Sequence, residues 1–119
     1  MSMNSVHLIG RVVASPERRN TTNNIAVVNF ALAVDRNYKN KDGEYETDFF
    51  NMAAFGDTAV FIERWFDKGN VIAIDGHLVQ NRYEDKEGNK RSYTDIIIDR
   101  AYFAGSEYTD HAKKNNRRK

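Results

Sequence analysis

The sequence of 119 residues has no cysteine, a single proline and no long apolar run. Without cysteine the chain can form neither a disulfide bond nor a zinc site with thiolate ligands. No apolar stretch approaches the roughly 18 residues that a membrane-spanning helix needs, and no stretch resembles a secretory signal. These absences favour a cytoplasmic protein that has no membrane partner.

Net charge is also nearly absent, because 18 lysine and arginine residues oppose 17 aspartate and glutamate residues. Five of the basic residues lie between Lys113 and Lys119, which leaves 13 basic against 17 acidic residues elsewhere. We expect one mildly acidic domain over residues 1–104 and a basic, disordered tail over residues 105–119. Since the domain has no general positive field, its binding to a polyanion would depend on local clusters of cations.

Alternation of apolar and polar residues, the pattern of β-strands, recurs through most of the sequence. Five strands are expected, over residues 6–14, 25–34, 47–55, 71–83 and 93–103. Polar stretches separate these strands, and the stretch 35–46 contains Asp42-Gly43, a pair typical of hairpin turns.

Between the third and fourth strands the apolar period becomes helical. Ala59, Ile62 and Phe66 fall on one face of a helix of about three turns. The expected ends of this helix are Asp57 or Thr58 as N-cap and Lys68 followed by Gly69 at the C-terminus. Five strands with one short helix between strands 3 and 4 predict an all-β, five-stranded Greek-key barrel of the OB-fold type.

The stretch from Thr47 to Phe55 has two faces that do not match. Alternation places Phe50, Met52 and Ala54 on one apolar face, which is suited to a core. The opposite face holds Thr47, Phe49, Asn51, Ala53 and Phe55. Two large rings therefore lie among small and polar groups, where they can stack on a flat ligand. Phe49 and Phe55 are predicted to be binding residues.

Two tyrosines have similar polar surroundings, and each is flanked by cations. Arg36, Lys39 and Lys41 lie close to Tyr38 in the sequence, and Arg82 and Lys86 lie close to Tyr83; Arg91, just before the next expected strand, is a sixth candidate cation. A base stacked on an exposed ring contributes about 1–3 kcal/mol, and neighbouring lysine or arginine can neutralise phosphate groups. The pattern predicts stacking by the four rings and phosphate contacts by the six cations. Each ring taken alone is equally consistent with the rim of a barrel or a subunit interface.

Motifs for catalysis, cofactors or metals do not occur in the sequence. It contains no glycine-rich phosphate loop and no nucleophile elbow. His7, His77 and His111 lie far apart, without the short spacing typical of metal ligands. The sequence therefore predicts a binding protein, not an enzyme, with neither cofactor nor metal. Trp65 is predicted to pack beside Phe66 on the helix and to take no part in binding.

Several short motifs, in their order and spacing, resemble the bacterial and phage-type single-stranded DNA-binding proteins over residues 3–103. The matching stretches are Val6–Val12, Ala26–Ala33, Thr47–Phe49 with Phe55-Gly56, Lys68–Val71, and Gly76–Leu78 leading to Arg82–Asp85. The resemblance implies an OB-fold and sequence-nonspecific binding of single-stranded DNA. It also implies a role in replication, recombination and repair at the nucleoid, and a homotetramer, with a dimer as the alternative.

Within this resemblance, the stacking rings of the family correspond to Tyr38, Phe49, Phe55 and Tyr83, and Val6–Val12 pairs between subunits. Family members continue through a linker to an acidic tip that recruits replication and repair proteins. This sequence has a basic stretch there, so it resembles a form that lacks the tip, and such partners are not implied. The residues themselves leave two other functions open, an RNA-binding OB module and an OB-fold protein-interaction subunit.

Overall fold

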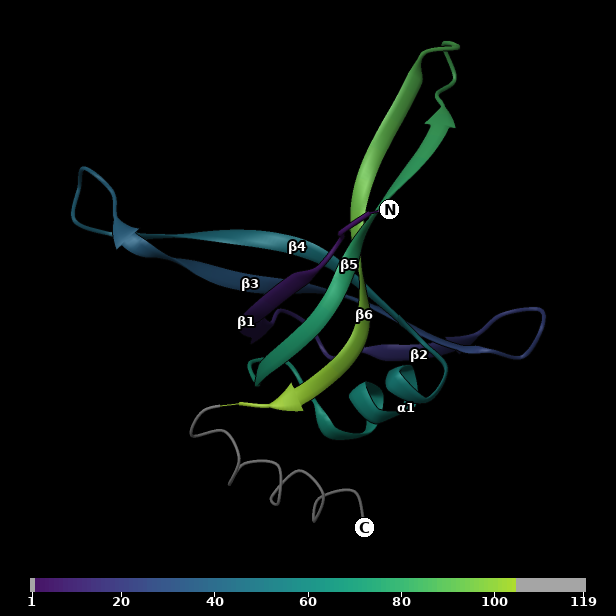
Figure 1. The fold of residues 1–119 in the computed structure, drawn as a ribbon, viewed down its shortest axis with the longest axis horizontal. Coiled ribbons are helices and arrows are strands. Elements are labelled where there is room, and N and C mark those ends of the chain that lie inside the picture. Colours follow the sequence, from purple (N-terminus) through teal and green to yellow (C-terminus); the bar gives the residue numbers. More distant parts are fainter. Residues whose placement is uncertain (1, 105–119) are drawn as a thin grey trace.

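The computed structural model describes residues 2–104, which form a closed β-barrel with one helix. The elements are β1 (Val6–Val12), β2 (Glu17–Asn20), β3 (Ala26–Lys39), β4 (Tyr45–Phe55), α1 (Gly56–Trp65), β5 (Val71–Glu84) and β6 (Lys90–Phe103). The strand order is β1-β5-β6-β4-β3-β2, and pairing of β1 with β3 closes five of the strands into a barrel (Figure 1). Among the strands of residues 2–104, only β4 and β6 pair in parallel. The prediction of a five-stranded OB-fold barrel is confirmed, whereas the predicted tail lies outside the described residues.

Four strands run further than their apolar alternation predicted. β3 and β4 continue through the polar stretch 35–46, where they pair only with each other as far as Lys39 and Tyr45. β5 and β6 likewise pair out to Glu84 and Lys90. A two-stranded arm is wetted on both faces, so its residues need no apolar alternation. The short strand β2 escaped prediction because its four residues are all polar and exposed.

The helix begins earlier than expected, and its predicted caps are wrong. Phe55 is the extended N-cap, without a side-chain cap, and Gly56 follows with a φ of 65° that turns the chain directly out of β4. Asp57 instead lies in the first turn, where its charge favours the helix dipole. Lys68 and Gly69 lie beyond the end of the helix. The N–H of Gly69 bonds the carbonyl of Val12, so this glycine belongs to the connection into β5.

The core inside the barrel is apolar and is closed at one end by α1. Ala59, Ile62 and Phe66 are fully buried, as their helical spacing predicted, and they join the inward side chains of the strands. The helix has 10 residues, so within residues 2–104 no helix is long and apolar enough to cross a membrane. Phe66 also stacks on Phe103, with ring centroids 5.3 Å apart. Within residues 2–104 no helix covers the far end of the barrel, where the two arms leave it (Figure 1).

Both arms end in the same turn, although their sequences share few identical residues. In the β3–β4 arm the side-chain oxygen of Asn40 accepts the N–H groups of Asp42 and Glu44. In the β5–β6 arm Asp85 does the same for Glu87 and Asn89. A glycine with φ near 80° stands at the same place in each turn, Gly43 at 78° and Gly88 at 82°. The two turns therefore present Lys41 and Lys86 at equivalent positions at the tips of the arms.

Candidate nucleic-acid interface

The outward face of β4 carries the two phenylalanines that the sequence singled out. Phe49 is 65% exposed and Phe55 is 46% exposed, whereas Met52 and Ala54 on the other face are buried in the core. The two rings are six residues apart on one strand, which corresponds to a spacing of about 20 Å. Ala53 between them is buried, although the alternation placed it on the wetted face. The predicted mismatch between the faces of β4 is confirmed for both rings.

Strand register extends this outward face onto the second arm. Ala53 pairs with Ile97 of β6, and Ile97 pairs with His77 of β5, so all three lie on one face. Counting by twos along β5 from His77 places Tyr83 on that face. Tyr83 is 51% exposed. We call the surface that holds Phe49, Phe55 and Tyr83 the ring face.

Tyr38 is exposed, but register does not place it on the ring face. The pairing of β3 with β4 shifts between Asp35 and Lys39, and Lys39 is the residue that pairs with Tyr45 on the ring-face side. Alternation then puts Tyr38 on the opposite face of the arm, where it lies near enough to Arg36 to help raise the pKa of that guanidinium. Three of the four predicted rings thus share one face, and Tyr38 lies around the edge of the β3–β4 arm.

Two exposed tyrosines on the ring face were missed by the sequence analysis. Tyr93 lies on β6 with its ring centroid 6.0 Å from that of Tyr83. Tyr45 pairs with Lys39, whose ammonium lies 5.7 Å from the ring centroid. The turn at Asp85–Asn89 could have revealed Tyr93, because such a turn fixes the register that brings Tyr93 and Tyr83 to one face.

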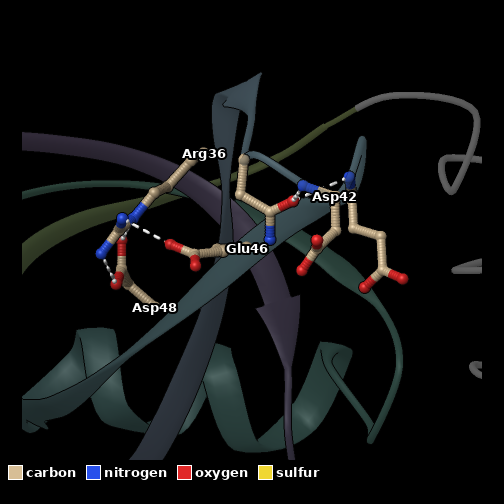
Figure 2. Close-up of polar contacts among 6 residues, drawn as sticks. Arg36, Asp42, Glu46 and Asp48 are labelled. Carbon is tan, nitrogen blue, oxygen red and sulfur yellow. Dashed lines mark hydrogen bonds and ion pairs between the residues drawn. The ribbon is translucent and has the colours of Figure 1, made fainter.

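Arg36 is held between two carboxylates of the neighbouring strand (Figure 2). Its Nε and Nη2 donate to the two oxygens of Asp48 at 3.0 and 3.1 Å, and its Nη1 donates to Glu46 at 2.6 Å. The hydrogen bond from Arg36 lowers the pKa of Asp48, and the same bond is the chief reason that the pKa of Arg36 is raised. Because this guanidinium already donates hydrogen bonds to two carboxylates, its charge and its donors are little available to a phosphate group.

The other predicted cations differ in how free they are. Arg91 donates from Nε to Asp85 at 3.0 Å, so it is partly engaged in the turn. Lys39, Lys41, Arg82 and Lys86 form no ion pair within residues 2–104. Lys41 and Lys86 stand at the arm tips, and Arg82 lies on the face opposite Tyr83. These four side chains are available to phosphate groups.

Register also reveals two arginines on the ring face that the sequence analysis did not select. Arg11 of β1 pairs with Ala33 of β3, which pairs with Phe49. Arg19 of β2 pairs with Val27, which pairs with Phe55. Each phenylalanine therefore has an arginine two strands away in the same row, at about 10 Å. No signal in the sequence could have found Arg19, because β2 lacks an apolar pattern.

Trp65 packs beside Phe103, and two of the histidines, His7 and His77, each lie next to an aspartate. The Trp65 ring packs edge-on against Phe103 at 6.2 Å, in agreement with the predicted packing role. His7 Nδ1 lies 2.6 Å from Asp75, and His77 Nδ1 lies 3.1 Å from Asp99. Among residues 2–104, no three His, Cys, Asp or Glu side chains are grouped so that they could hold a metal ion.

Replacing Asp85 with asparagine is expected to reduce the loss of stability that the protein shows in acid. The N–H of Asn89, and after it the Arg91 guanidinium, hold the pKa of Asp85 below its ordinary value. Such a carboxylate stabilises the fold above its unfolded pKa of about 3.9, and this contribution is lost as pH falls through the lower folded pKa. Thermal unfolding of the wild type and of Asp85→Asn, at neutral pH and at about pH 3, measures how much stability each protein loses in acid.

The first arm supplies the control for this substitution. Asn40 accepts the same two N–H groups there without carrying a charge, so Asp85→Asn is expected to keep the turn. Asn40→Asp is the reverse exchange and is expected to make stability more sensitive to acid. An Asp85→Asn protein that loses as much stability in acid as the wild type would contradict the role given to this carboxylate.

The sequence matches the model of the single-strand binding protein family over residues 3–104. It is 35% identical to a protein named single-stranded DNA-binding protein 1 from Staphylococcus aureus (strain MSSA476), over 91% of this chain and 69% of that protein. It is 34% identical to a single-stranded DNA-binding protein of Streptococcus mutans, over 96% of this chain and 70% of that protein. A single-stranded DNA-binding protein 2 of S. aureus (strain Mu50 / ATCC 700699) is 36% identical over 85% of this chain.

Proposed function

The chain belongs to the single-strand binding protein family and binds single-stranded DNA, and we propose that it does so by stacking bases on the ring face. The observation that carries this mechanism is the shared register of Phe49, Phe55 and Tyr83, three exposed rings on one continuous sheet surface. Stacking is tolerant of sequence because every base has an aromatic face, so the binding is sequence-nonspecific. Tyr38 takes a further base where the strand passes around the edge of the β3–β4 arm.

Phosphate groups are neutralised by cations that surround these rings. Of the six predicted contacts, Lys39, Lys41, Arg82 and Lys86 have no ion-pair partner within residues 2–104, and Arg91 pairs with Asp85. Arg11 and Arg19 join them, because they lie in the same rows as Phe49 and Phe55. Arg36 is assigned a different task. Its bonds to Asp48 and Glu46 hold the two strands of the arm together where their register shifts.

Assembly is proposed to occur through β1, as a homotetramer with a dimer as the alternative. Among the described residues, Val6 to Gly10 pair with β5 on one side and have no partner strand on the other. An open edge of this kind can pair with the same edge of a second copy. Ile9, Ala73 and Tyr102 lie in one row on the outer face beside that edge, and Ile9 and Tyr102 are exposed.

The role that follows is non-catalytic: the protein coats exposed single strands during DNA replication, recombination and repair, in the cytoplasm at the nucleoid. An RNA-binding module is the alternative that the ring face alone permits, because stacking surfaces separate DNA from RNA weakly. Membership of the family favours DNA. A purely protein-binding barrel is disfavoured, because the cations around the rings suit a polyanion.

The dependence of affinity on salt tests both the ligand and the assignment of the cations. We expect oligo(dT) to bind more tightly than oligo(rU) or duplex DNA, with an affinity that falls as salt is raised. Removing one cation that neutralises a phosphate group is expected to reduce the slope of log affinity against log salt by about 0.7. Lys41→Gln and Lys86→Gln, at equivalent places in the two turns, should each show this change.

Arg36→Gln is the contrasting variant in the same titration. Because Asp48 and Glu46 already neutralise Arg36, its removal is expected to leave the salt slope unchanged while it weakens binding through disorder of the arm. If the salt slope fell as much in Arg36→Gln as in Lys41→Gln, Arg36 would have to be counted among the residues that contact phosphate groups. Equal or stronger binding of oligo(rU) would instead favour the RNA-binding alternative.

A further inference from the structure

A cavity lies in the fork between the two arms, at the open end of the barrel. β4 and β6 pair only at Met52 with Ile96 and at Ala53 with Ile97. Beyond these pairs each strand continues into its own arm, and Figure 1 shows the arms pointing in different directions. The cavity measures about 420 Å³ and is lined by Val6, Leu8, Phe49, Phe50, Asn51, Leu78, Thr94 and Ile96. We call it the fork cavity.

The lining combines an apolar wall with two polar side chains. Leu78 illustrates the wall: by alternation it shares the inward face of β5 with Ile72 and Ile74, yet it is 46% exposed because the barrel ends there. Asn51 and Thr94 come from the two strands that diverge, β4 and β6. Neither of these two side chains has a hydrogen-bond partner among residues 2–104, and no cation lines the cavity.

We propose that the fork cavity receives one nucleobase of the bound strand, packed against Phe49 with its polar edge toward Asn51 and Thr94. The inference rests on the proposed function, because Phe49 belongs to both the ring face and the cavity wall. A strand stacked along the ring face therefore passes the mouth of the cavity. The site adds discrimination between bases to a surface that otherwise stacks any of them.

The chemistry of the lining selects a base from among the parts of a nucleotide. A phosphate group would enter a space without a positive charge, which is unfavourable. A nucleobase has apolar faces suited to Phe49 and Leu78, and an edge of donors and acceptors suited to an amide and a hydroxyl. The volume lies within the range of about 300–1,000 Å³ that is usual for sites of small molecules.

Methyl NMR of the whole protein with oligo(dT) tests the occupant directly. We expect NOEs between thymine base protons and the methyl groups of Leu78 and Val6, together with ring-current shifts. The methyl groups of Ile9 and Val13 are exposed outside the cavity, line none of it, and serve as internal controls. Saturable binding without base NOEs to Leu78 or Val6 would overturn the proposal and leave the proposed function standing. Absence of any binding would overturn both.

Two isosteric replacements test recognition at the edge of the base. Asn51→Leu and Thr94→Val keep the shape of the cavity and remove its free hydrogen-bonding groups, and both positions are exposed, so folding should survive. The ratios of affinity among oligo(dT), oligo(dC) and oligo(dA) are expected to change by about 5-fold or more. The salt slope should stay constant, because neither replacement removes a positive charge. Unchanged ratios in the double variant would overturn recognition by these side chains.

Discussion

Replacement of Phe49 by leucine is expected to weaken binding of oligo(dT) by about 1–3 kcal/mol, the range for one stacked base. Phe49 is 65% exposed and stands where the ring face meets the fork cavity, so in the proposed complex we expect it to contact the bound DNA more centrally than the other rings do. Leucine preserves an apolar side chain of similar size but has no flat face. Fluorescence anisotropy with labelled oligo(dT), at several salt concentrations, would measure the weakening and show an unchanged salt slope.

Phe49→Tyr is the matched control, because it keeps the aromatic ring and should keep most of the affinity. The mass of the assembly should be the same for both variants, since Phe49 pairs with β3 and its replacement leaves the backbone edge of β1 unchanged. If leucine bound DNA as well as tyrosine does, stacking at this position would be excluded. If leucine changed the assembly mass without weakening DNA binding, the rings would form a protein interface.

Gly10→Ala is expected to destabilise the barrel by about 1–3 kcal/mol or more, a large part of the stability of a small domain. A Cβ at this position would overlap the carbonyl oxygen of Ala33 and lie 3.0 Å from both Leu32 Cγ and Val34 Cγ2. The nearest obstacle is backbone, so it cannot be relieved by a change of rotamer. Gly10 stands where β1 meets β3, at the seam that closes the barrel.

Urea unfolding of Gly10→Ala and of Ile9→Ala would isolate this effect. Ile9 is the preceding residue and is 63% exposed in the single chain, so its truncation should change the stability of the barrel itself by no more than about 0.5 kcal/mol, whatever it does to assembly through β1. Measurements at two protein concentrations would separate stability of the barrel from stability of an assembly. If the two variants had equal urea midpoints, β1 and β3 could move apart to accept the Cβ without loss of stability, which would contradict the prediction.

Prediction from the sequence succeeded where side-chain alternation is tied to a buried face. The burial of Ala59 and Ile62 on the helix and of Phe66 directly after it, and the mismatched faces of β4, follow from period alone because one side of each element must be apolar. Prediction failed where both sides of an element are wetted. No apolar period marks the strand β2, the outer halves of the arms or the ends of the helix. These features are defined by backbone hydrogen bonds and backbone conformation instead.

The candidate binding residues divide along the same line. The four rings were visible as large aromatic side chains in polar surroundings, and all four are exposed. Their grouping was not visible, because a common face depends on which residues pair across strands that are distant in the sequence. The same reason hid Tyr93, Arg11 and Arg19, and it concealed the engagement of Arg36 by Asp48 and Glu46.

The sequence by itself determined the barrel class, the family and the aromatic chemistry of the surface, since these depend on residue type and local period. The tertiary structure decided which rings share a face, which cations remain free and where the fork cavity opens. Those features arise from strand register and from the divergence of two hairpins, and register couples residues through backbone hydrogen bonds that leave no mark on local composition.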